Sequence, residues 1–348
     1  MKNQNLKIVI WAFVTVIFYS CRQNIDVEYQ KITGETMGTY YQIQYEYNAG
    51  TNLKPIVDSV LADFNHSLST YIDNSTISKI NQALKAYCYS PKEDKYFLYS
   101  WKKAIELNKM TAGAFQPTVM PLVNYWGFGY GKREKINSPD QRKIDSLLQL
   151  VGTDKISFDE REDTICFYKK YPGVGIDLSA SAKGHGVDVI AELISGMGIK
   201  NYFVEIGGEI RASGVNTHGE AWTVGVNRPS EDASLQEIEI VLRISNKSLA
   251  TSGNYRNFYK TDQGKVSHII DPTTGMARPT DVLSASVVAE DCLTADALAT
   301  ACMVLGWEKA AAIIDEIDGA EVFLIYVKDG VEEPQYYFSD GFKSLVKR

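Results

Sequence analysis

The chain has 348 residues, a formal net charge of −7, and a composition of 45% hydrophobic and 23% charged residues. This balance excludes wholesale disorder and collagen-like or coiled-coil architectures, which have very different compositions. An acidic chain also disfavours nucleic acid as a partner, because binding to phosphate backbones usually needs a basic face. The length allows one large domain or two of average size.

The first residues, 1–20, differ from the rest of the chain and indicate a targeting segment. Lys2 and Lys7 give it a positive start without an acidic residue, and an apolar run over 8–19 follows. This run is shorter than the roughly 20 apolar residues that a membrane-spanning helix needs, and it fits the core of a signal peptide.

The apolar run ends in Ser20-Cys21, which resembles a bacterial lipobox. We therefore expect a lipoprotein signal peptide over 1–20, a lipid anchor on Cys21, a short tether over 21–35 and a folded domain over 36–348. A plain signal peptide or a single uncleaved anchor is the alternative.

Four further cysteines lie in the expected domain: Cys88, Cys166, Cys292 and Cys302. None has the spacing of a zinc ribbon or of a redox motif. Cys292 and Cys302 lie in an apolar segment, so we expect them to be buried thiols. An oxidising compartment would permit one disulfide, but the spacing leaves its pairing open.

The first half of the chain is predicted to be mostly helical. Apolar residues such as Val60, Phe64 and Leu68 recur at helical spacing after a first alternating strand. The expected elements are a strand over 40–47, helices over 54–70, from Asn74 or Ser75 onward, over 92–110 and over 140–150, and an ordered loop over 113–131.

From about residue 163 onward, strands and helices alternate. The expected strands are 164–168, 175–178, 202–206, 210–214, 222–226, 238–244, 282–289 and 322–327, and the expected helices are 182–195, 293–305 and 307–317. No repeat, low-complexity tract or linker interrupts the pattern. We therefore expect a single α+β domain with a mixed, mostly antiparallel β core flanked by helices.

A first candidate site lies where the strand expected over 175–178 leads into a helix. Exposed backbone N–H groups at a helix start suit a phosphate, and Lys183 in the first turn would add a positive charge. Asp177 at the strand end could hold a ribose hydroxyl, a ring nitrogen or a metal. The alternative is a solvated lysine at an ordinary helix start.

Two turn segments carry further candidates. In Glu205-Ile-Gly-Gly-Glu209, paired glycines make a tight turn or permit close approach of a ligand, and the two carboxylates could simply be solvated. His268 precedes a turn, Asp271-Pro-Thr-Thr-Gly275, where it could act as a base near neutral pH. A structural role is the alternative for a lone histidine.

Asp296 and Thr300 are four residues apart, so they share one face of a predicted helix that is otherwise rich in alanine. Both offer the hard oxygen ligands that magnesium prefers. A buried hydrogen bond between them is the alternative. Met37 and the aromatic groups over 113–129 could line the site of a flat heterocycle, although core packing uses the same residues.

The order of these segments resembles the ApbE family. The motifs are Met-Gly-Thr at 37–39, Gly-Ala-Phe-Gln-Pro-Thr at 113–118, Asp-Leu-Ser-Ala-Ser-Ala-Lys-Gly at 177–184, Gly-Gly-Glu at 207–209, Ser-His-Ile-Ile-Asp-Pro-Thr-Thr-Gly at 267–275 and Ala-Asp-Ala-Leu-Ala-Thr-Ala at 295–301. The resemblance covers about 30–340 and implies the T-fold-like architecture of that family. It implies Mg²⁺-assisted transfer of FMN from FAD to a threonine or serine hydroxyl of a target protein, with AMP as the leaving group.

The resemblance also implies roles for individual residues. It assigns metal ligation to Asp296, Thr300 and the carbonyl of Ala180, and activation of the acceptor hydroxyl to His268. It assigns FAD contacts to Met37, Tyr71, Ala114, Phe115, Gln116, Asp177, Lys183 and Ile270. Gln116 departs from the aspartate that is usual at its position in the family.

Two other functions use the same residues: a metal-dependent FAD pyrophosphatase, and a lipoprotein that binds FAD without chemistry. The implied partners are FAD, a target protein that is a membrane redox-pump subunit, and the membrane itself through lipid on Cys21. The expected location is the periplasmic face of the bacterial cell envelope, with the inner membrane favoured.

Overall fold

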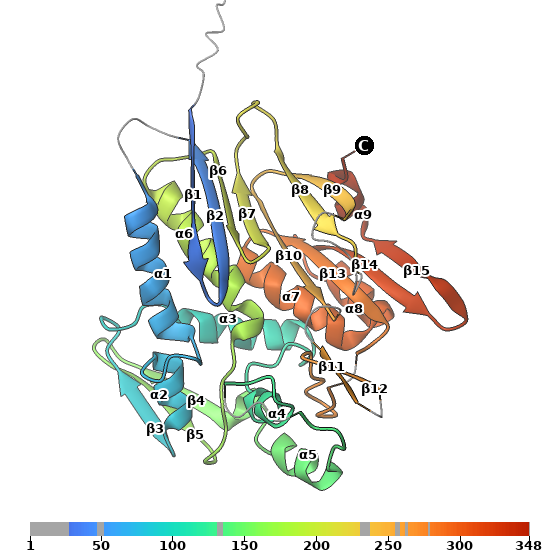
Figure 1. Cartoon of the computed structure of the whole chain (residues 1–348). Coiled ribbons are helices and arrows are strands. Elements are labelled where there is room, and N and C mark those ends of the chain that lie inside the picture. The colour runs from blue at the N-terminus through green and yellow to red at the C-terminus, as the bar shows by residue number, and fades with distance from the viewer. Residues whose placement is uncertain are drawn as a thin grey trace, which may run out of the picture.

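The computed structural model describes residues 28–46, 52–130, 135–229, 237–254, 258–261, 264–277 and 279–347. The expected signal peptide and Cys21 lie outside these residues. Within them, every helix is too short or too polar to cross a membrane. Figure 1 shows a large twisted sheet with helices against it and a smaller helical and stranded part below it.

Eight antiparallel strands form the large sheet, in the order β1-β2-β6-β7-β10-β13-β14-β15. The expected α+β class with an antiparallel core is thereby confirmed. The strands are β1 (Tyr29–Thr36), β2 (Thr39–Glu46), β6 (Tyr202–Ile206), β7 (Glu209–Ser213), β10 (Lys247–Gly253), β13 (Val282–Ala289), β14 (Glu321–Lys328) and β15 (Val331–Phe338).

Both faces of this sheet are covered. Helices α1 (Lys54–Leu68), α6 (Ser179–Gly196), α7 (Cys292–Leu305) and α8 (Trp307–Asp315) lie on one face, and the hairpin β8 (Trp222–Asn227)–β9 (Ile238–Ile244) with α9 (Asp340–Leu345) lies on the other. In β14, Val322 and Leu324 face the helices, whereas Phe323 and Ile325 face the hairpin. Burial on both faces explains why this strand is apolar without alternation.

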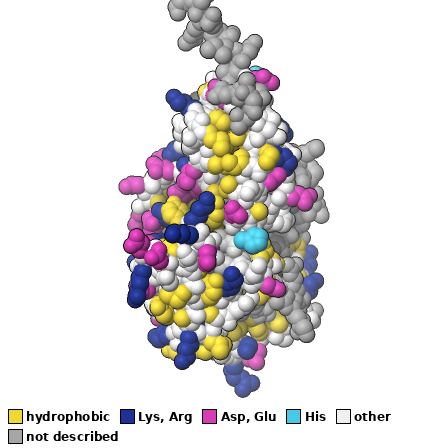
Figure 2. Space-filling view, turned by 90° about the vertical axis from the view of Figure 1, so that its left-hand side faces the viewer, with side chains coloured by type: hydrophobic (Ala, Val, Ile, Leu, Met, Phe, Trp, Pro, Cys, Tyr) yellow, Lys and Arg dark blue, Asp and Glu magenta, His cyan; other side chains and the backbone are white. Residues whose placement is uncertain are grey.

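The outer surface of α1 is polar. Lys54 and Asp58 form an exposed ion pair of 3.0 Å, and acidic and basic side chains are interspersed over this side of the molecule (Figure 2). Phe64 and Leu68 pack into the core, as the helical spacing predicted. Val57 and Leu61 are buried as well, whereas Val60 is only half-buried.

The smaller part of the molecule carries a three-stranded sheet of order β3-β5-β4. A disulfide joins Cys88 of β3 to Cys166 of β5, which settles the pairing that the sequence left open. Cys292 and Cys302 are buried thiols, as expected. The elements here are α2 (Thr76–Gln82), β3 (Ala86–Tyr89), α3 (Phe97–Met110), α4 (Met120–Tyr125), α5 (Gln141–Leu148), the 3-10 turn η1 (Thr153–Lys155), β4 (Ile156–Glu160), β5 (Ile165–Lys169), β11 (Phe258–Thr261) and β12 (Gly264–Ser267).

Several boundaries differ from the prediction. The tether expected over 21–35 is wrong in its second half, because β1 begins at Tyr29 and pairs along its length with β2. The loop expected over 113–131 contains α4. The predicted list also lacked β3, β4, β10, β11, β12 and β15, which are mostly short or polar strands that owe their form to a partner.

The strand expected over 175–178 is also absent. This segment is extended, but the side chain of Asn81 takes the place of a partner strand: its Oδ1 accepts from Ile176 N at 2.7 Å and its Nδ2 donates to Ile176 O at 2.8 Å. Asp177 N donates to Pro117 O at 2.8 Å. The backbone is thereby satisfied without a sheet.

Helices α6 and α7 touch at Gly184. A Cβ atom at Gly184 would lie 2.2 Å from the carbonyl oxygen of Cys292 and 2.8 Å from Cβ of Asp296. Only glycine permits this approach, which brings the side chains of the two helices to one end of the large sheet.

Candidate active site

A cavity of about 570 Å³ lies at that end of the sheet, within the usual range of about 300–1,000 Å³ for ligand sites. The β1–β2 and β6–β7 turns, the ends of α6 and α7, α4 and the segment after β12 all contribute to its wall. Every residue to which the family resemblance assigns a role lines it: Met37, Tyr71, Ala114, Phe115, Gln116, Asp177, Ala180, Lys183, His268, Ile270, Asp296 and Thr300. Glu205, the other carboxylate of the turn segment, does not line the cavity and accepts from Tyr40 OH instead.

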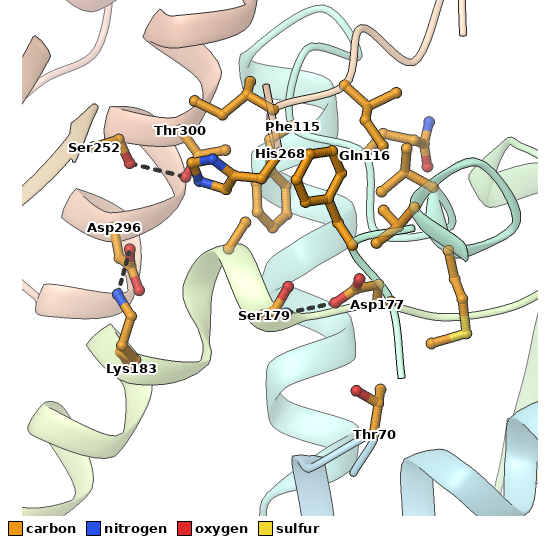
Figure 3. A pocket seen from close by; sticks show the side chains of 18 of the residues that line it. Thr70, Phe115, Gln116, Asp177, Ser179, Lys183, Ser252, His268, Asp296 and Thr300 are labelled. Carbon is orange, nitrogen blue, oxygen red and sulfur yellow. Dashed lines mark hydrogen bonds and ion pairs between the residues drawn. The ribbon is translucent and has the colours of Figure 1, made fainter. Parts of the chain in front are cut away.

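Asp177 and Lys183 sit at the start of α6, but their placement differs from the expectation. The helix begins at Ser179, so Lys183 lies in its second turn rather than its first. Asp177 lies just before the helix, where its Oδ1 accepts from Ser179 N at 2.9 Å (Figure 3). The carboxylate therefore caps a backbone N–H that a bound phosphate would otherwise use.

Lys183 lies between two buried carboxylates. Its Nζ is 2.5 Å from Glu209 Oε1 and 4.0 Å from Asp296 Oδ1. Burial alone would favour the neutral amine, but Asp296 and Glu209 raise the pKa of Lys183, so the ammonium stays charged. One positive charge therefore faces two carboxylates in this wall of the cavity.

The two carboxylates are held differently. Asp296 Oδ2 accepts from Gly184 N at 3.0 Å, whereas Glu209 Oε2 is buried without a hydrogen-bond partner among the described residues. Burial raises the pKa of both groups, against the lowering effect of Lys183. Negative charge in excess of the single ammonium, together with an unpaired oxygen, suits a site that takes up a further cation.

Glu209 is the residue that sequence reasoning undervalued. The sequence leaves a solvated carboxylate open for Glu209, but only 4% of this residue is exposed. Gly207 and Gly208 have φ angles of 62° and 105°, a tight turn that presents the first residue of β7 to the cavity. The sequence signal for Glu209 is the Gly-Gly turn that directly precedes it. A second signal is Lys183, which needs a carboxylate partner once it is buried.

Asp296 and Thr300 both project from α7 into the cavity, one helical turn apart. Thr300 Oγ1 lies 3.2 Å from Ser252 Oγ at the end of β10 (Figure 3), whereas Asp296 accepts from Gly184 N. Among the described residues no hydrogen bond joins Asp296 to Thr300, so that alternative is wrong. Among the described residues, no three or more His, Cys, Asp and Glu side chains are placed so that they could hold a metal ion together. A carboxylate, a hydroxyl and the nearby Ala180 carbonyl nevertheless form a donor set of hard oxygens that fits Mg²⁺.

Apolar and aromatic side chains line the other side of the cavity. Phe115 and Ile270 are buried, whereas Tyr71 is 63% exposed at the rim. Met37 adopts a φ of 51°, which is uncommon for a residue with a side chain, in the turn between β1 and β2. A flat heterocycle could lie on this side while its phosphates face Lys183.

His268 follows β12 and faces the cavity (Figure 3). Its ring packs edge-on against Phe128, with 6.3 Å between the ring centroids. The turn that follows is held by Asp271, whose carboxylate accepts from Thr273 N and Thr274 Oγ1, both at 2.8 Å. His268 therefore lies beside the cavity and next to a hydrogen-bonded turn, as the sequence predicted.

The fold and the cavity define an α+β protein whose candidate site has one charged wall and one apolar wall. A model of the ApbE family matches residues 37–324, so the chain belongs to the ApbE family. It is 36% identical over 322 residues to the FAD:protein FMN transferase of Vibrio cholerae serotype O1, covering 91% of this chain and 92% of that protein. The FAD:protein FMN transferase of Haemophilus influenzae is also 36% identical, over 323 residues, covering 91% of each chain.

Solved structures of flavin transferases have a similar fold. The flavin transferase ApbE from Vibrio cholerae is 34% identical, with a TM-score of 0.79 over 92% of this chain and 99% of that one. The apo form of the Pseudomonas stutzeri flavinyl transferase ApbE is 27% identical, with a TM-score of 0.80 over 92% of this chain and 97% of that one.

Proposed function

We propose that this chain is an FAD:protein FMN transferase. Its FAD is cleaved at the pyrophosphate: a threonine or serine oxygen of the target protein forms a bond to the FMN phosphorus, and the bond from that phosphorus to the bridging oxygen breaks. The hydroxyl proton goes to a base, and AMP leaves with the bridging oxygen. The observation that carries this proposal is the gathering of all the family-matched residues around one cavity.

Mg²⁺ is part of the proposal, with Asp296, Thr300 and the Ala180 carbonyl as the groups that would hold it. When bound, it would neutralise negative charge on the phosphate oxygens of FAD. Glu209 Oε2 has no hydrogen-bond partner among the described residues, and Asp296 Oδ1 is 4.0 Å from the Lys183 ammonium. These unpaired carboxylate oxygens support the binding of a further cation in this wall of the cavity.

The chain's own side chains have separate tasks in this reaction. The Lys183 ammonium binds phosphate oxygens, and Glu209, whose Oε1 lies 2.5 Å from Lys183 Nζ, holds it in place. His268 accepts the proton of the acceptor hydroxyl, because it is the histidine that lines the cavity. The apolar wall that includes Phe115 and Ile270 holds a ring system and excludes water.

One experiment tests this reaction against its two alternatives. The soluble chain without residues 1–21 is incubated with FAD, Mg²⁺ and a candidate acceptor domain, and AMP and the acceptor mass are followed. We expect AMP together with an acceptor mass increased by one FMN unit. AMP without that increase would indicate an FAD pyrophosphatase, and FAD binding without AMP would indicate a flavin carrier.

We also propose that lipid on Cys21 anchors the chain at the periplasmic face of the cell envelope, with the inner membrane favoured, and that a membrane redox-pump subunit is the target. The charged start, the apolar run and Ser20-Cys21 support the anchor. Fractionation of cells that express the full chain or its Cys21→Ala variant tests it. We expect lipid on the N-terminal peptide and recovery with membranes only when Cys21 is present.

A further inference from the structure

Gln116 stands where the family's aspartate is usual, and the structure shows how its amide is oriented. Its Oε1 accepts from Thr118 Oγ1 at 2.8 Å and from Thr118 N at 3.3 Å. A backbone N–H can only donate, so the group that faces it must be the amide oxygen and not the NH₂ group. The orientation of Gln116 follows from this contact.

The hydroxyl of Thr118 is itself fixed. Thr118 is fully buried, and its Oγ1 accepts from Gly152 N at 2.7 Å. Its single proton is therefore left for Gln116 Oε1, which then has two protein donors for its two lone pairs. Among the described residues, Gln116 Nε2 has no acceptor, so the amide offers the cavity donors only.

An aspartate at this position would offer the opposite chemistry, since an ionised carboxylate only accepts. Resting on the proposed function, we infer that Gln116 is a specificity-determining residue that donates a hydrogen bond to an obligate acceptor of FAD. Such an acceptor is a carbonyl oxygen or an unprotonated ring nitrogen.

The surroundings favour an atom of a ring system over a phosphate. Gln116 follows Phe115 and lies on the side of the cavity away from Lys183 and Asp296 (Figure 3). Val119 and Ile270 line the cavity as well, and the Asp177 carboxylate, which lies on the same side as Gln116 (Figure 3), disfavours a phosphate there. Carbonyl oxygens belong to the flavin ring and unprotonated ring nitrogens to both the flavin and the adenine, so either half of FAD could supply the acceptor.

The test measures equilibrium binding of FAD to wild type, Gln116→Met and Gln116→Glu by flavin fluorescence in the absence of an acceptor protein. In Gln116→Glu, one oxygen still accepts from Thr118 and the other replaces the donor NH₂ group with lone pairs. We expect the dissociation constant to rise severalfold in Gln116→Met and by at least about tenfold in Gln116→Glu, because an acceptor then faces an acceptor. Thermal unfolding of each variant checks that the fold is retained.

Titration with FMN and with AMP separates the two sources of the acceptor. The loss in Gln116→Glu should appear with only one of these ligands, and that ligand identifies the half of FAD that Gln116 contacts. Equal or tighter FAD binding by Gln116→Glu would overturn the inference, because the ligand would then present a donor. Equal binding by all three proteins would overturn it too, because Gln116 would then not contact FAD. Both results are independent of FMN transfer, so failure of the proposed function would be seen separately.

Discussion

Two buried carboxylates lie on the contact between α6 and α7, and they differ in how they are satisfied. Asp188 accepts from Cys292 N at 2.9 Å and Leu293 N at 2.8 Å, and it pairs with Arg211 at 2.7 Å. Asp296 accepts from Gly184 N alone among the described residues, and the nearest ammonium is 4.0 Å away.

The two residues are almost equally buried, at 5% and 3% exposure for Asp188 and Asp296. Burial therefore does not distinguish the structural carboxylate from the one in the candidate site. The difference lies in the partners. Asp188 uses its oxygens to hold the start of α7 against α6 and β7, whereas Asp296 keeps capacity for a ligand that enters the cavity.

The largest expected effect is that of Asp296→Asn on turnover. The substitution keeps the shape of the side chain but removes the charge on which the proposed metal site depends. We expect Mg²⁺-dependent AMP release to fall roughly 1,000-fold or more, equivalent to about 4 kcal/mol. Denaturant unfolding should change little, and unchanged turnover would refute the role of Asp296 in metal binding.

Asp188→Asn should show the reverse pattern. It weakens the pairing of the half-buried Arg211 guanidinium, which is left with the exposed Glu192 carboxylate at 4.0 Å, and such a loss costs about 2 kcal/mol of unfolding free energy. Urea unfolding measures the loss of unfolding free energy. Turnover per folded molecule, measured in parallel, should change little. If Asp188→Asn lost activity while keeping full stability, the contrast between the two carboxylates would be wrong.

His185 lies on α6 between Lys183 and Asp188 and makes a third kind of buried polar group. Ser100 Oγ lies 2.7 Å from its Nδ1, and the Phe64 ring packs edge-on against it at 5.0 Å. Burial lowers the pKa of His185 from 6.5 to about 4. The neutral ring is thus favoured in the folded chain.

Because the folded pKa lies below the unfolded one, the unfolded chain binds more protons between these values. The contribution of His185 is therefore complete above about pH 6.5 and is lost as the pH falls toward 4, by about 3 kcal/mol in total. Urea unfolding of wild type and His185→Gln across this range measures it. The variant should lose less stability on acidification, and identical slopes would contradict the prediction.

Gly184→Ala tests the close approach of helices α6 and α7, which carry Asp188 and Asp296. Its Cβ would lie 2.2 Å from the Cys292 carbonyl oxygen, so the two helices must separate, at a cost of about 2 kcal/mol. FAD affinity should fall as well, because Lys183 and Asp296 move apart. Gly196→Ala on the same helix meets open space and should be neutral or slightly stabilising. Equal thermal shifts for the two variants would argue against a tight contact.

Much of the candidate site could be predicted because its residues occur in short motifs in a fixed order. Each motif places a residue type at a turn or a helix end, and local sequence is enough to define such places, as Ser75 shows by capping α2 through Ser78 N at 3.2 Å. The pairing of Lys183 with Glu209 could not be predicted in this way, since one residue lies on α6 and the other on β7.

The polarity that Gln116 presents to the cavity also escaped the sequence, because it depends on Gly152 acting through Thr118. The polar edge strand β1 escaped it for a related reason: only pairing with β2 shows that Tyr29–Thr36 is a strand. The orientation of Gln116 depends on a residue that is distant in the chain, and the strand β1 depends on backbone hydrogen bonds to another strand. Neither kind of contact can be read from the local sequence.

The sequence by itself determined the α+β class, because local periodicity and turn chemistry depend on neighbouring residues. Its resemblance to the ApbE family predicted which residues line the cavity. The tertiary structure alone decided that Cys88 pairs with Cys166, and that Asp188 is structural while Asp296 faces a cavity. It also decided that the acidic chain holds a charged lysine where phosphates would lie. The physical reason is that burial, hydrogen bonding and charge pairing are properties of contacts between segments far apart in the chain, and net charge of −7 does not report them.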